Sequence, residues 1–217
     1  MISANTYKVL GREKLSQHTF LLYTERPNVP VKAGQCFSVG TAELGINREY
    51  SIYSGADDPF LTFLIRELED GIVSSALGAC DQGSVVEIGG PYGDFCLSTQ
   101  HIQQNEFIFI ATGTGIAPFH SFVKTYPELN YLLLHGIRHA EEAYENQHYK
   151  ADGYVACMSQ PINLDESLRV TDWLQQHPIA TDVIYYLCGN RKMITDVTPM
   201  LLGAGVSGDN IFIETFF

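Results

Sequence analysis

Residues 107–118 read FIFIATGTGIAP, and their pattern is the strongest indication of the fold in this sequence. The apolar run Phe107–Ala111 predicts a strand buried on both faces. The loop Thr112–Pro118 contains two glycines, which let a backbone approach an anion closely, and Pro118 suits the first turn of a helix. A strand, a glycine loop and a helix in this order predict one unit of an α/β sheet. Taken alone, the loop is equally consistent with a tight connection, because it is neither GxGxxG nor a Walker phosphate-binding loop.

Strand-like runs continue downstream of this loop and alternate with segments long enough for crossover helices. Such alternation predicts a five-stranded parallel sheet covered on both faces, with ligands bound beyond the carboxyl ends of its strands. The four further strands are expected at Tyr131–His135, Tyr154–Met158, Val183–Leu187 and Ile211–Glu214.

Upstream, the apolar segments are short, rich in β-formers and separated by turn residues, which predicts a small antiparallel barrel. The polar stretch 98–105 is expected to be a linker, so the sequence predicts two domains, residues 1–99 and 100–217. The expected barrel strands are His18–Thr24, Gln35–Val39, Tyr50–Tyr53, Leu61–Arg66, Val85–Ile88 and Phe95–Leu97.

The composition narrows the functional classes. Among 217 residues, 13 Lys and Arg face 25 Asp and Glu, and the net charge of -12 argues against binding to nucleic acid or an anionic membrane. No apolar run approaches the ~18 residues of a membrane span, so we expect a soluble, cytoplasmic protein. The five cysteines form no CxxC pair or cluster for a metal, so any redox centre should be a bound organic cofactor.

A second polar cluster lies in the barrel half. It comprises Arg48-Glu49-Tyr50-Ser51 and the segment 71–77, GIVSSAL. Arginine pairs with phosphate, tyrosine offers a stacking face, and a glycine–serine segment supplies amides and hydroxyls, so the cluster suits an anionic, aromatic ligand. An ordinary strand with an exposed arginine and a core tyrosine would look the same, and the residues alone do not separate these two interpretations.

The order of the motifs is more specific than any one of them. RxYS at 48–51, GIVSSAL at 71–77, GPYGDF at 90–95, ATGTGIAP at 111–118 and LCGN at 187–190 follow one another along the chain. In this order they resemble the ferredoxin/flavodoxin–NADP(+) reductase family of bacterial type. The resemblance implies an antiparallel Greek-key barrel that binds FAD, followed by an α/β domain that binds NADP(H).

The resemblance also implies roles for residues of the barrel half. Arg48 would pair with the flavin phosphates, Tyr50 would stack on the isoalloxazine, and Ser51 would hydrogen-bond flavin N5. The end of the strand that contains Ile65 would pass beside the pyrophosphate. Amides and hydroxyls of the helix start would hold that pyrophosphate, and the residues concerned are Gly71, Ile72, Val73, Ser74 and Ser75.

In the second half, the resemblance implies that the pyridine nucleotide lies on Gly113, Thr114 and Gly115. Cys188 and Gly189 would lie near the nicotinamide, where a small residue leaves room for C4 to approach N5. These assignments make Ser51, Cys188 and Glu214 the catalytic candidates, with no metal site.

At the carboxyl end, Phe216 would cover the flavin face that nicotinamide must reach, with Phe217 beyond it. Phenylalanine keeps the stacking of the tyrosine common in the family but lacks its hydroxyl. The alternative is a terminal strand whose phenylalanines belong to the core.

Nucleotide choice depends on arginine, because its planar fork suits a 2′-phosphate. Arg138, Ser159 and Arg169 fit the pattern usual in bacterial NADP-type reductases, and they favour NADP over NAD. Gln160 departs from that pattern, which carries arginine there.

Two other polar clusters suggest no chemistry. His135 and His139 stand four apart, but the strand before them and Gly136 between them make a helical metal pair improbable. Glu141, Glu142 and Glu145 are expected to form the solvated face of a helix.

The sequence therefore predicts an NADPH-dependent flavoprotein reductase that passes single electrons to a separate small carrier, ferredoxin or flavodoxin. Alternatives are an NAD(P)H:flavin reductase, the reductase component of an oxygenase, and a non-catalytic flavin-binding subunit for electron transfer. Acidic carriers would need a local basic patch on this acidic protein. Its candidates are Lys8, Arg12, Lys14, Arg191 and Lys192.

Overall fold

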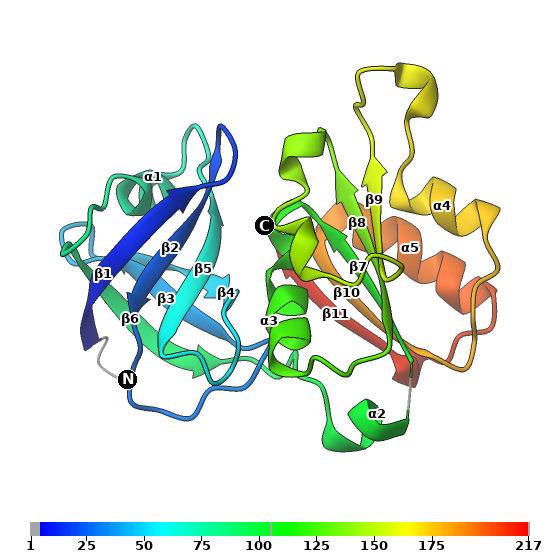
Figure 1. Ribbon diagram of the computed structural model, residues 1–217, viewed down its shortest axis with the longest axis horizontal. Helices are drawn as coiled ribbons and strands as arrows, with labels where there is room; N and C mark the ends of the chain where they lie inside the picture. The colour runs from blue at the N-terminus through cyan, green and yellow to red at the C-terminus, as the bar shows by residue number, and fades with distance from the viewer. Residues whose placement is uncertain (1–4, 105, 217) are drawn as a thin grey trace. The chain divides into compact units, whose positions relative to one another are not determined.

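The computed structural model describes residues 5–104 and 106–216 (Figure 1). It divides into two compact units. The barrel unit contains the chain up to Cys96 together with Ala117–Thr125, and the sheet unit contains Leu97–Ile116 and Tyr126 onward.

The barrel unit is built on a six-stranded antiparallel sheet with the strand order β4-β3-β6-β1-β2-β5. The two outermost strands meet through a bridge between Ile52 and Phe63, which closes the sheet. Strand β6 pairs between β1 and β3, the non-sequential pairing of a Greek key, so the predicted barrel is confirmed. The strands are β1 (Asn5–Lys14), β2 (Thr19–Glu25), β3 (Cys36–Thr41), β4 (Ile46–Ser51), β5 (Phe60–Arg66) and β6 (Val85–Tyr92).

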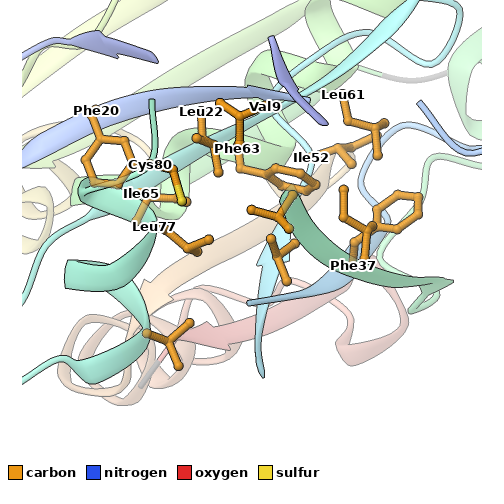
Figure 2. Close-up of a cluster of buried hydrophobic side chains, with 14 of the residues drawn as sticks. Val9, Phe20, Leu22, Phe37, Ile52, Leu61, Phe63, Ile65, Leu77 and Cys80 are labelled. Atoms are coloured by element: carbon orange, nitrogen blue, oxygen red, sulfur yellow. The ribbon is translucent and has the colours of Figure 1, made fainter. Parts of the chain in front are cut away.

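The interior of the barrel is apolar (Figure 2). Phe37 and Phe63, from β3 and β5, meet edge to face with their ring centroids 6.2 Å apart. Helix α1 (Ile72–Gly78) adds Val73 and Leu77 to the same core, so the helix start is held against the barrel by its own apolar residues. Burial of each large side chain contributes about 1.5–3 kcal/mol.

Two predictions for this half were wrong. Strand β1 was not expected, because its sequence NTYKVLGREK mixes charged and apolar residues and only Val9 is fully buried among the strand's larger apolar side chains. Conversely, Phe95–Leu97 belongs to no strand. The Phe95 ring instead packs against the rings of Phe119 and Phe122, each with a centroid distance of 6.1 Å.

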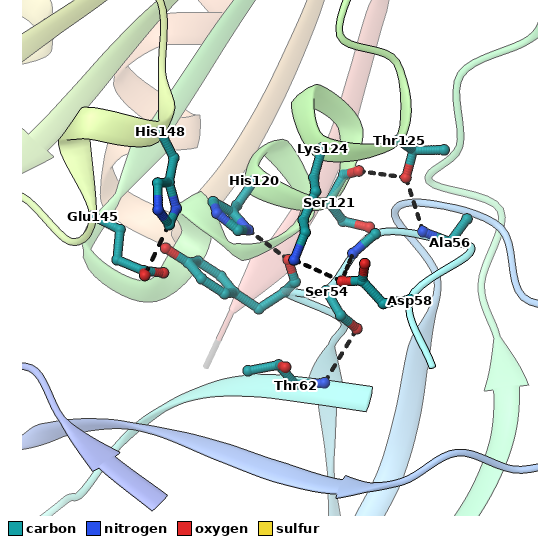
Figure 3. A network of polar contacts seen from close by, with 12 residues as sticks. Ser54, Ala56, Asp58, Thr62, His120, Ser121, Lys124, Thr125, Glu145 and His148 are labelled. Carbon is teal, nitrogen blue, oxygen red and sulfur yellow. Dashed lines mark hydrogen bonds and ion pairs between the residues drawn. The ribbon is translucent and has the colours of Figure 1, made fainter. Parts of the chain in front are cut away.

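The partners of Phe95 lie on helix α3 (Ala117–Thr125), which follows the glycine loop in sequence but packs with the barrel (Figure 3). The Lys124 ammonium lies 2.7 Å from the Asp58 carboxylate, and the amide of Ala56 donates to Thr125 Oγ1 over 2.9 Å. The His120 ring stacks on Tyr53 with centroids 3.7 Å apart. The barrel unit is therefore not a continuous segment of the chain.

The sheet unit contains the predicted five-stranded parallel sheet, with the order β11-β10-β7-β8-β9. Helices α4 (Val170–Gln176) and α5 (Arg191–Gly203) cover one face with apolar residues such as Leu174 and Val197. The strands are β7 (Phe107–Thr112), β8 (Tyr131–Ile137), β9 (Tyr154–Met158), β10 (Ile184–Asn190) and β11 (Ile211–Phe216).

The opposite face of this sheet carries aromatic residues. Phe109 and Tyr186 lie edge to face at 6.2 Å, and Phe212 stacks on Tyr186 at 4.7 Å. Helix α2 (Thr99–Gln104) forms where a linker was expected, and its His101 ring meets Phe212 at 5.8 Å. The 3₁₀ turns of this unit are Gly113–Ile116, Ala140–Glu142, Asn146–His148, Leu164–Glu166 and Gly208–Asn210.

Across the part of the chain that the structure describes, no helix is both long and apolar enough to span a membrane. All five cysteines are free thiols, and Cys36, Cys80, Cys157 and Cys188 are buried.

Candidate cofactor sites

Strand β4 places Arg48 and Tyr50 on the same face, because side chains two residues apart in a strand point the same way. They pair in register with Val39 and Phe37 of β3. Burial raises the pKa of Tyr50 to about 12, and the positive charge of Arg48 opposes this rise, so the two groups lie near one another. The Tyr50 ring leans on Phe63 at 6.5 Å. This face of β4 therefore presents the exposed guanidinium of Arg48 beside the Tyr50 ring, which is held by its contact with Phe63.

Ser51 is the last residue of β4, and strand alternation directs it to the other face from Tyr50. It pairs with Cys36 and is buried, with 4% of its surface exposed. The structure thus brings Arg48 and Tyr50 together and places Ser51 behind them, at the point where the chain leaves the sheet.

The segment Gly71–Ser75 opens helix α1, which contacts both β3 and β4. The Ser74 hydroxyl donates to the Gly71 carbonyl over 3.1 Å and accepts from the Leu68 amide over 3.2 Å, so it stabilises the turn. The Ser75 amide donates to the same carbonyl. The amides of the first helical turn have no partner within a helix, and they are the groups left to hold an anion here.

Side chains in this segment differ in exposure. Val73 and Ile65 are buried in the barrel core, so only their backbone can face a ligand, whereas Ile72 is 63% exposed. A Cβ on Gly71 would lie 2.9 Å from Leu68 Cβ, so the turn needs glycine. A cation, an aromatic face and helix-start amides on neighbouring elements are a donor set that fits a phosphorylated flavin.

The glycine loop of the sheet unit is packed against the end of β10. A Cβ on Gly115 would lie 2.7 Å from the carbonyl carbon of Cys188 and from Gly189 Cα. A Cβ on Gly189 (φ +143°) would lie 2.9 Å from the Thr112 nitrogen. Gly113 has φ +54° with open space around it, so its glycine is required by conformation alone. The loop can therefore present its backbone to a ligand.

Asn190 connects this loop to helix α5, a role that the sequence analysis missed. Its amide and its Nδ2 both donate to Thr112 Oγ1 over 2.9 Å. Its Oδ1 accepts from the Met193 amide over 2.8 Å and caps the helix. The available signal was an asparagine placed directly between a strand and a helix, which is a preferred N-cap.

His135 is the other missed residue. It is fully buried on β8, where Nε2 lies 2.9 Å from the Gly113 carbonyl oxygen and Nδ1 lies 2.9 Å from the Tyr154 hydroxyl. Burial lowers the pKa of His135 to about 4, although the Gly113 carbonyl and Glu142 favour the charged form. The ring is therefore neutral near pH 7.

Cys188 lies opposite Glu214 in the parallel register of β10 and β11. The thiol is buried, and burial together with the Glu214 carboxylate holds its pKa well above the usual range. Phe216 pairs with Asn190 at the end of the same two strands and is half-buried. Phe217 lies outside the described residues.

The predicted 2′-phosphate residues come together at the carboxyl ends of β8 and β9. The Ser159 and Gln160 amides donate to the Ile137 and Arg138 carbonyls, each over 2.9 Å. Arg169 follows directly, because the Leu168 amide donates to the Met158 carbonyl at the end of β9. The backbone of Arg138 therefore lies beside that of Ser159 and Gln160, and Arg169 follows the end of the same strand.

The position of Glu142 differs from the one predicted from the sequence. It was assigned to a solvated helical face, but it lies in a 3₁₀ turn and is 6% exposed. Its carboxylate accepts the Arg138 amide over 2.8 Å and Arg138 Nε over 2.9 Å, and it also accepts from Nη2. Glu142 raises the pKa of Arg138, which keeps that guanidinium charged and fixes its orientation. The signal available in the sequence was the four-residue spacing of the two charges.

Two family models match the chain. One is the oxidoreductase FAD-binding domain, over residues 8–96, and the other is the oxidoreductase NAD-binding domain, over residues 109–198. Curated relatives include flavohemoproteins of Xylella fastidiosa (26% identity over 91% of this chain and 54% of the relative) and Bacillus subtilis (27%, 94% and 57%). The electron transfer component of toluate 1,2-dioxygenase from Pseudomonas putida is 28% identical over 78% of this chain and 54% of its own. The chain thus spans about half the length of these relatives.

Solved structures agree on the fold. A ferredoxin NADP+ reductase from Neisseria gonorrhoeae with bound FAD and NADP superimposes with a TM-score of 0.87 at 21% identity, covering 100% of both chains. The cytochrome P450 reductase GcoB of Amycolatopsis gives 0.86 at 21% identity, over 100% of this chain and 72% of its own. With both domain models matched in the order that the motifs predicted, this chain belongs to the oxidoreductases that join an FAD-binding domain to an NAD-binding domain, and it has the fold of ferredoxin–NADP(+) reductases.

Proposed function

We propose that this protein is a reductase that moves a hydride between NADP(H) and bound FAD and exchanges single electrons with a small carrier such as ferredoxin or flavodoxin. One observation carries the proposal. The carboxyl edge of the sheet unit gathers the glycine loop, the Arg138–Ser159 region and the Cys188–Glu214 pair, which are the groups needed for a phosphate, a 2′-phosphate and a nicotinamide.

In the barrel unit, Arg48 supplies a positive charge for the flavin phosphates, and Tyr50 supplies a face for the ring system. The backbone amides of Ile72, Val73 and Ser74, in the first turn of α1, would hold the pyrophosphate as uncharged donors. Bound FAD supplies the two-electron to one-electron conversion that no side chain of this protein can perform. The Ser51 hydroxyl, at the end of β4 where the chain leaves the sheet, would hold the flavin edge by a hydrogen bond to N5.

In the sheet unit, Gly113–Gly115 would bind the nucleotide pyrophosphate, and Gly189 lets the end of β10 pack closely against Thr112 below the nicotinamide position. The Cys188 thiol keeps its proton because of its burial and its carboxylate neighbour. It would therefore act as a small, neutral, polarizable group buried beneath the site and not as a nucleophile. Glu214 orients that thiol and holds a negative charge at the edge of the site, where an oxidised nicotinamide carries a positive one.

The test is an anaerobic titration of the purified protein, first with NADPH and then with NADH, followed by flavin absorbance. We expect bound FAD that is bleached by NADPH at lower concentration than by NADH. Arg48→Ala should lose FAD on dilution, because a charge-assisted hydrogen bond contributes roughly 1.5–3 kcal/mol. Arg12→Ala, an exposed arginine on β1, is the matched control and should retain it. Absence of flavin from the wild type, or full flavin retention by Arg48→Ala, contradicts the assignment.

A second candidate is a reductase that delivers electrons to another domain, another protein or free flavin. It is favoured by the relatives, in which the matching region makes up about half of a longer protein such as a flavohemoprotein or a dioxygenase electron transfer component. The NADPH-reduced protein mixed with ferredoxin, flavodoxin or free FMN distinguishes the candidates by which acceptor reoxidises it fastest. Among the residues of the basic patch predicted to dock a carrier, Lys192 is paired with Asp196 at 2.8 Å. Lys8, Arg12, Lys14 and Arg191 are therefore the stronger docking candidates.

A further inference from the structure

The Gly113–Thr114 peptide is the part of the glycine loop whose orientation matters most for an anion. In a trans peptide the carbonyl and the following N–H point in opposite directions. The Gly113 carbonyl is directed at His135 Nε2, 2.9 Å away. The Thr114 N–H therefore points away from His135, toward the opposite side of the loop, where both residues are partly exposed.

The tautomer of His135 follows from its two partners. A carbonyl oxygen can only accept, so Nε2 carries the hydrogen and donates to Gly113. In a neutral ring Nδ1 is then an acceptor, and the Tyr154 hydroxyl donates to it over 2.9 Å. The chain of hydrogen bonds runs in one direction, from Tyr154 through His135 to the loop.

Gly113 itself has the backbone freedom that such a restraint would remove. Its φ of +54° is open to glycine at little cost, and a Cβ there would meet no atom within 4 Å. A rotation of the Gly113–Thr114 peptide would turn a carbonyl oxygen toward an approaching phosphate and replace attraction by repulsion. It would also leave the fully buried His135 Nε2–H without a partner, which is costly.

The aromatic residues around His135 hold the ring in place. Tyr154 lies at 6.0 Å edge to face and Tyr144 at 6.2 Å, and Tyr149 stacks on Tyr154 at 5.3 Å. These rings fix the imidazole on β8 and shield its hydrogen bonds from water, so the restraint on the loop is rigid.

We propose that His135, oriented by Tyr154, is a positioning residue that locks the Gly113–Thr114 peptide with the Thr114 N–H facing the pyrophosphate of the bound dinucleotide. The inference rests on the proposed function, because it assumes that the glycine loop receives a pyridine nucleotide. It adds that the loop's affinity for anions depends on a buried, neutral histidine that touches no ligand.

The experiment measures binding by calorimetry to the flavin-loaded protein, with two probes. NADP+ contains the pyrophosphate, whereas adenosine 2′-monophosphate carries only the 2′-phosphate. His135→Leu removes the donor, and we expect the dissociation constant for NADP+ to rise about ten- to hundredfold, the effect of losing a hydrogen bond to a charged group. The dissociation constant for adenosine 2′-monophosphate should change less than about twofold.

Two further variants keep the test decisive if His135→Leu folds poorly. His135→Gln retains an N–H donor near the position of Nε2 and should restore most of the NADP+ affinity. Tyr154→Phe leaves the histidine but frees its tautomer, and it should weaken NADP+ binding severalfold while sparing the smaller probe. Thermal melting reports the folding of each variant.

Equal weakening of both probes means general damage to the unit and overturns the proposal. The proposal is also overturned if folded His135→Leu binds NADP+ with the wild-type dissociation constant. It is overturned as well if His135→Gln binds NADP+ as weakly as His135→Leu does. A wild type that binds neither NADP+ nor NAD+ overturns the proposed function itself, and that result is visible before any variant is made.

Discussion

The Sγ–H of Cys188 donates to Glu214 Oε2 over 3.8 Å, across the register of β10 and β11. This thiol is fully buried and has a pKa well above its usual range. We expect iodoacetamide to leave Cys188 unmodified in the native protein, because only the thiolate reacts, and to modify the half-buried Cys96 first. Mass spectrometry of digests before and after unfolding is the measurement. Labelling of Cys188 as fast as Cys96 would contradict its burial.

His135 makes stability depend on pH. Its pKa is about 4 in the folded protein and 6.5 when exposed, so between these values the unfolded chain binds more protons. The stabilisation by neutral His135 is fully present above pH 6.5 and declines as the pH falls toward 4. The free energy of unfolding should therefore fall by roughly 2 kcal/mol between pH 7 and pH 5 because of this one residue. Denaturant unfolding at both values, with His135→Gln as the control, should show a smaller fall for the variant.

Gly113 and Gly115 should differ in how well they tolerate substitution by alanine. Gly113→Ala faces open space and should cost about 1–2 kcal/mol for its left-handed backbone. Gly115→Ala would place a Cβ against the Cys188–Gly189 backbone, so the end of β10 must move. We expect Gly115→Ala to lower the melting temperature more than Gly113→Ala and to impair nucleotide reduction of the flavin. The reverse order would show that the loop and β10 are not packed in this way.

Nucleotide choice should depend on the two arginines. Arg138→Ala and Arg169→Ala should each raise the Michaelis constant for NADPH about tenfold, the scale of one charge-assisted hydrogen bond, with little change for NADH. Glu142→Gln removes a carboxylate that orients Arg138 and should have a smaller effect of the same sign. Steady-state kinetics with both nucleotides measure this selectivity. Equal effects on the two nucleotides would make NAD the leading cofactor.

The carboxyl end provides the last test. If Phe216 covers the flavin, Phe216→Ser removes the cost of displacing a stacked ring, so NADP(H) should bind more tightly and turnover should slow as product release becomes limiting. If Phe216 belongs to the core, the same change should cost ~3–5 kcal/mol of stability and leave nucleotide affinity unaltered. A thermal melt and a nucleotide titration of one variant distinguish the two outcomes.

The parallel sheet could be predicted almost strand by strand, because its strands are mainly apolar runs and the central strands β7, β8 and β10 are largely buried on both faces. Strand β1 could not, since its pairing with β2 and β6 depends on distant residues and its own side chains are mostly polar or exposed. Motif order also assigned residues to the cofactors, and those assignments remain predictions. The structure then placed Arg48 beside Tyr50 on one strand face, as the spacing of two residues requires.

The supporting residues escaped prediction for a different reason. His135 and Asn190 act on the glycine loop from 22 and 78 residues away in sequence, and only the folded sheet shows that they meet it. Glu142 resembled any surface glutamate, because charge alone does not reveal whether a carboxylate is buried. What a side chain touches is set by tertiary structure, whereas what it can do chemically is visible in the sequence.

Helix α3 has a consequence for how such chains can be recombined. The NAD-binding family model at 109–198 includes residues 117–125, yet these residues pack with the barrel. A chimaera joined once near residue 99 would pair a barrel with a foreign α3, and Phe95, Tyr53 and Asp58 would meet unmatched partners. Successful exchange of nucleotide-binding halves between relatives therefore requires a nested graft that keeps 117–125 with its native barrel. In evolution, the two halves should be inherited together rather than shuffled as independent modules.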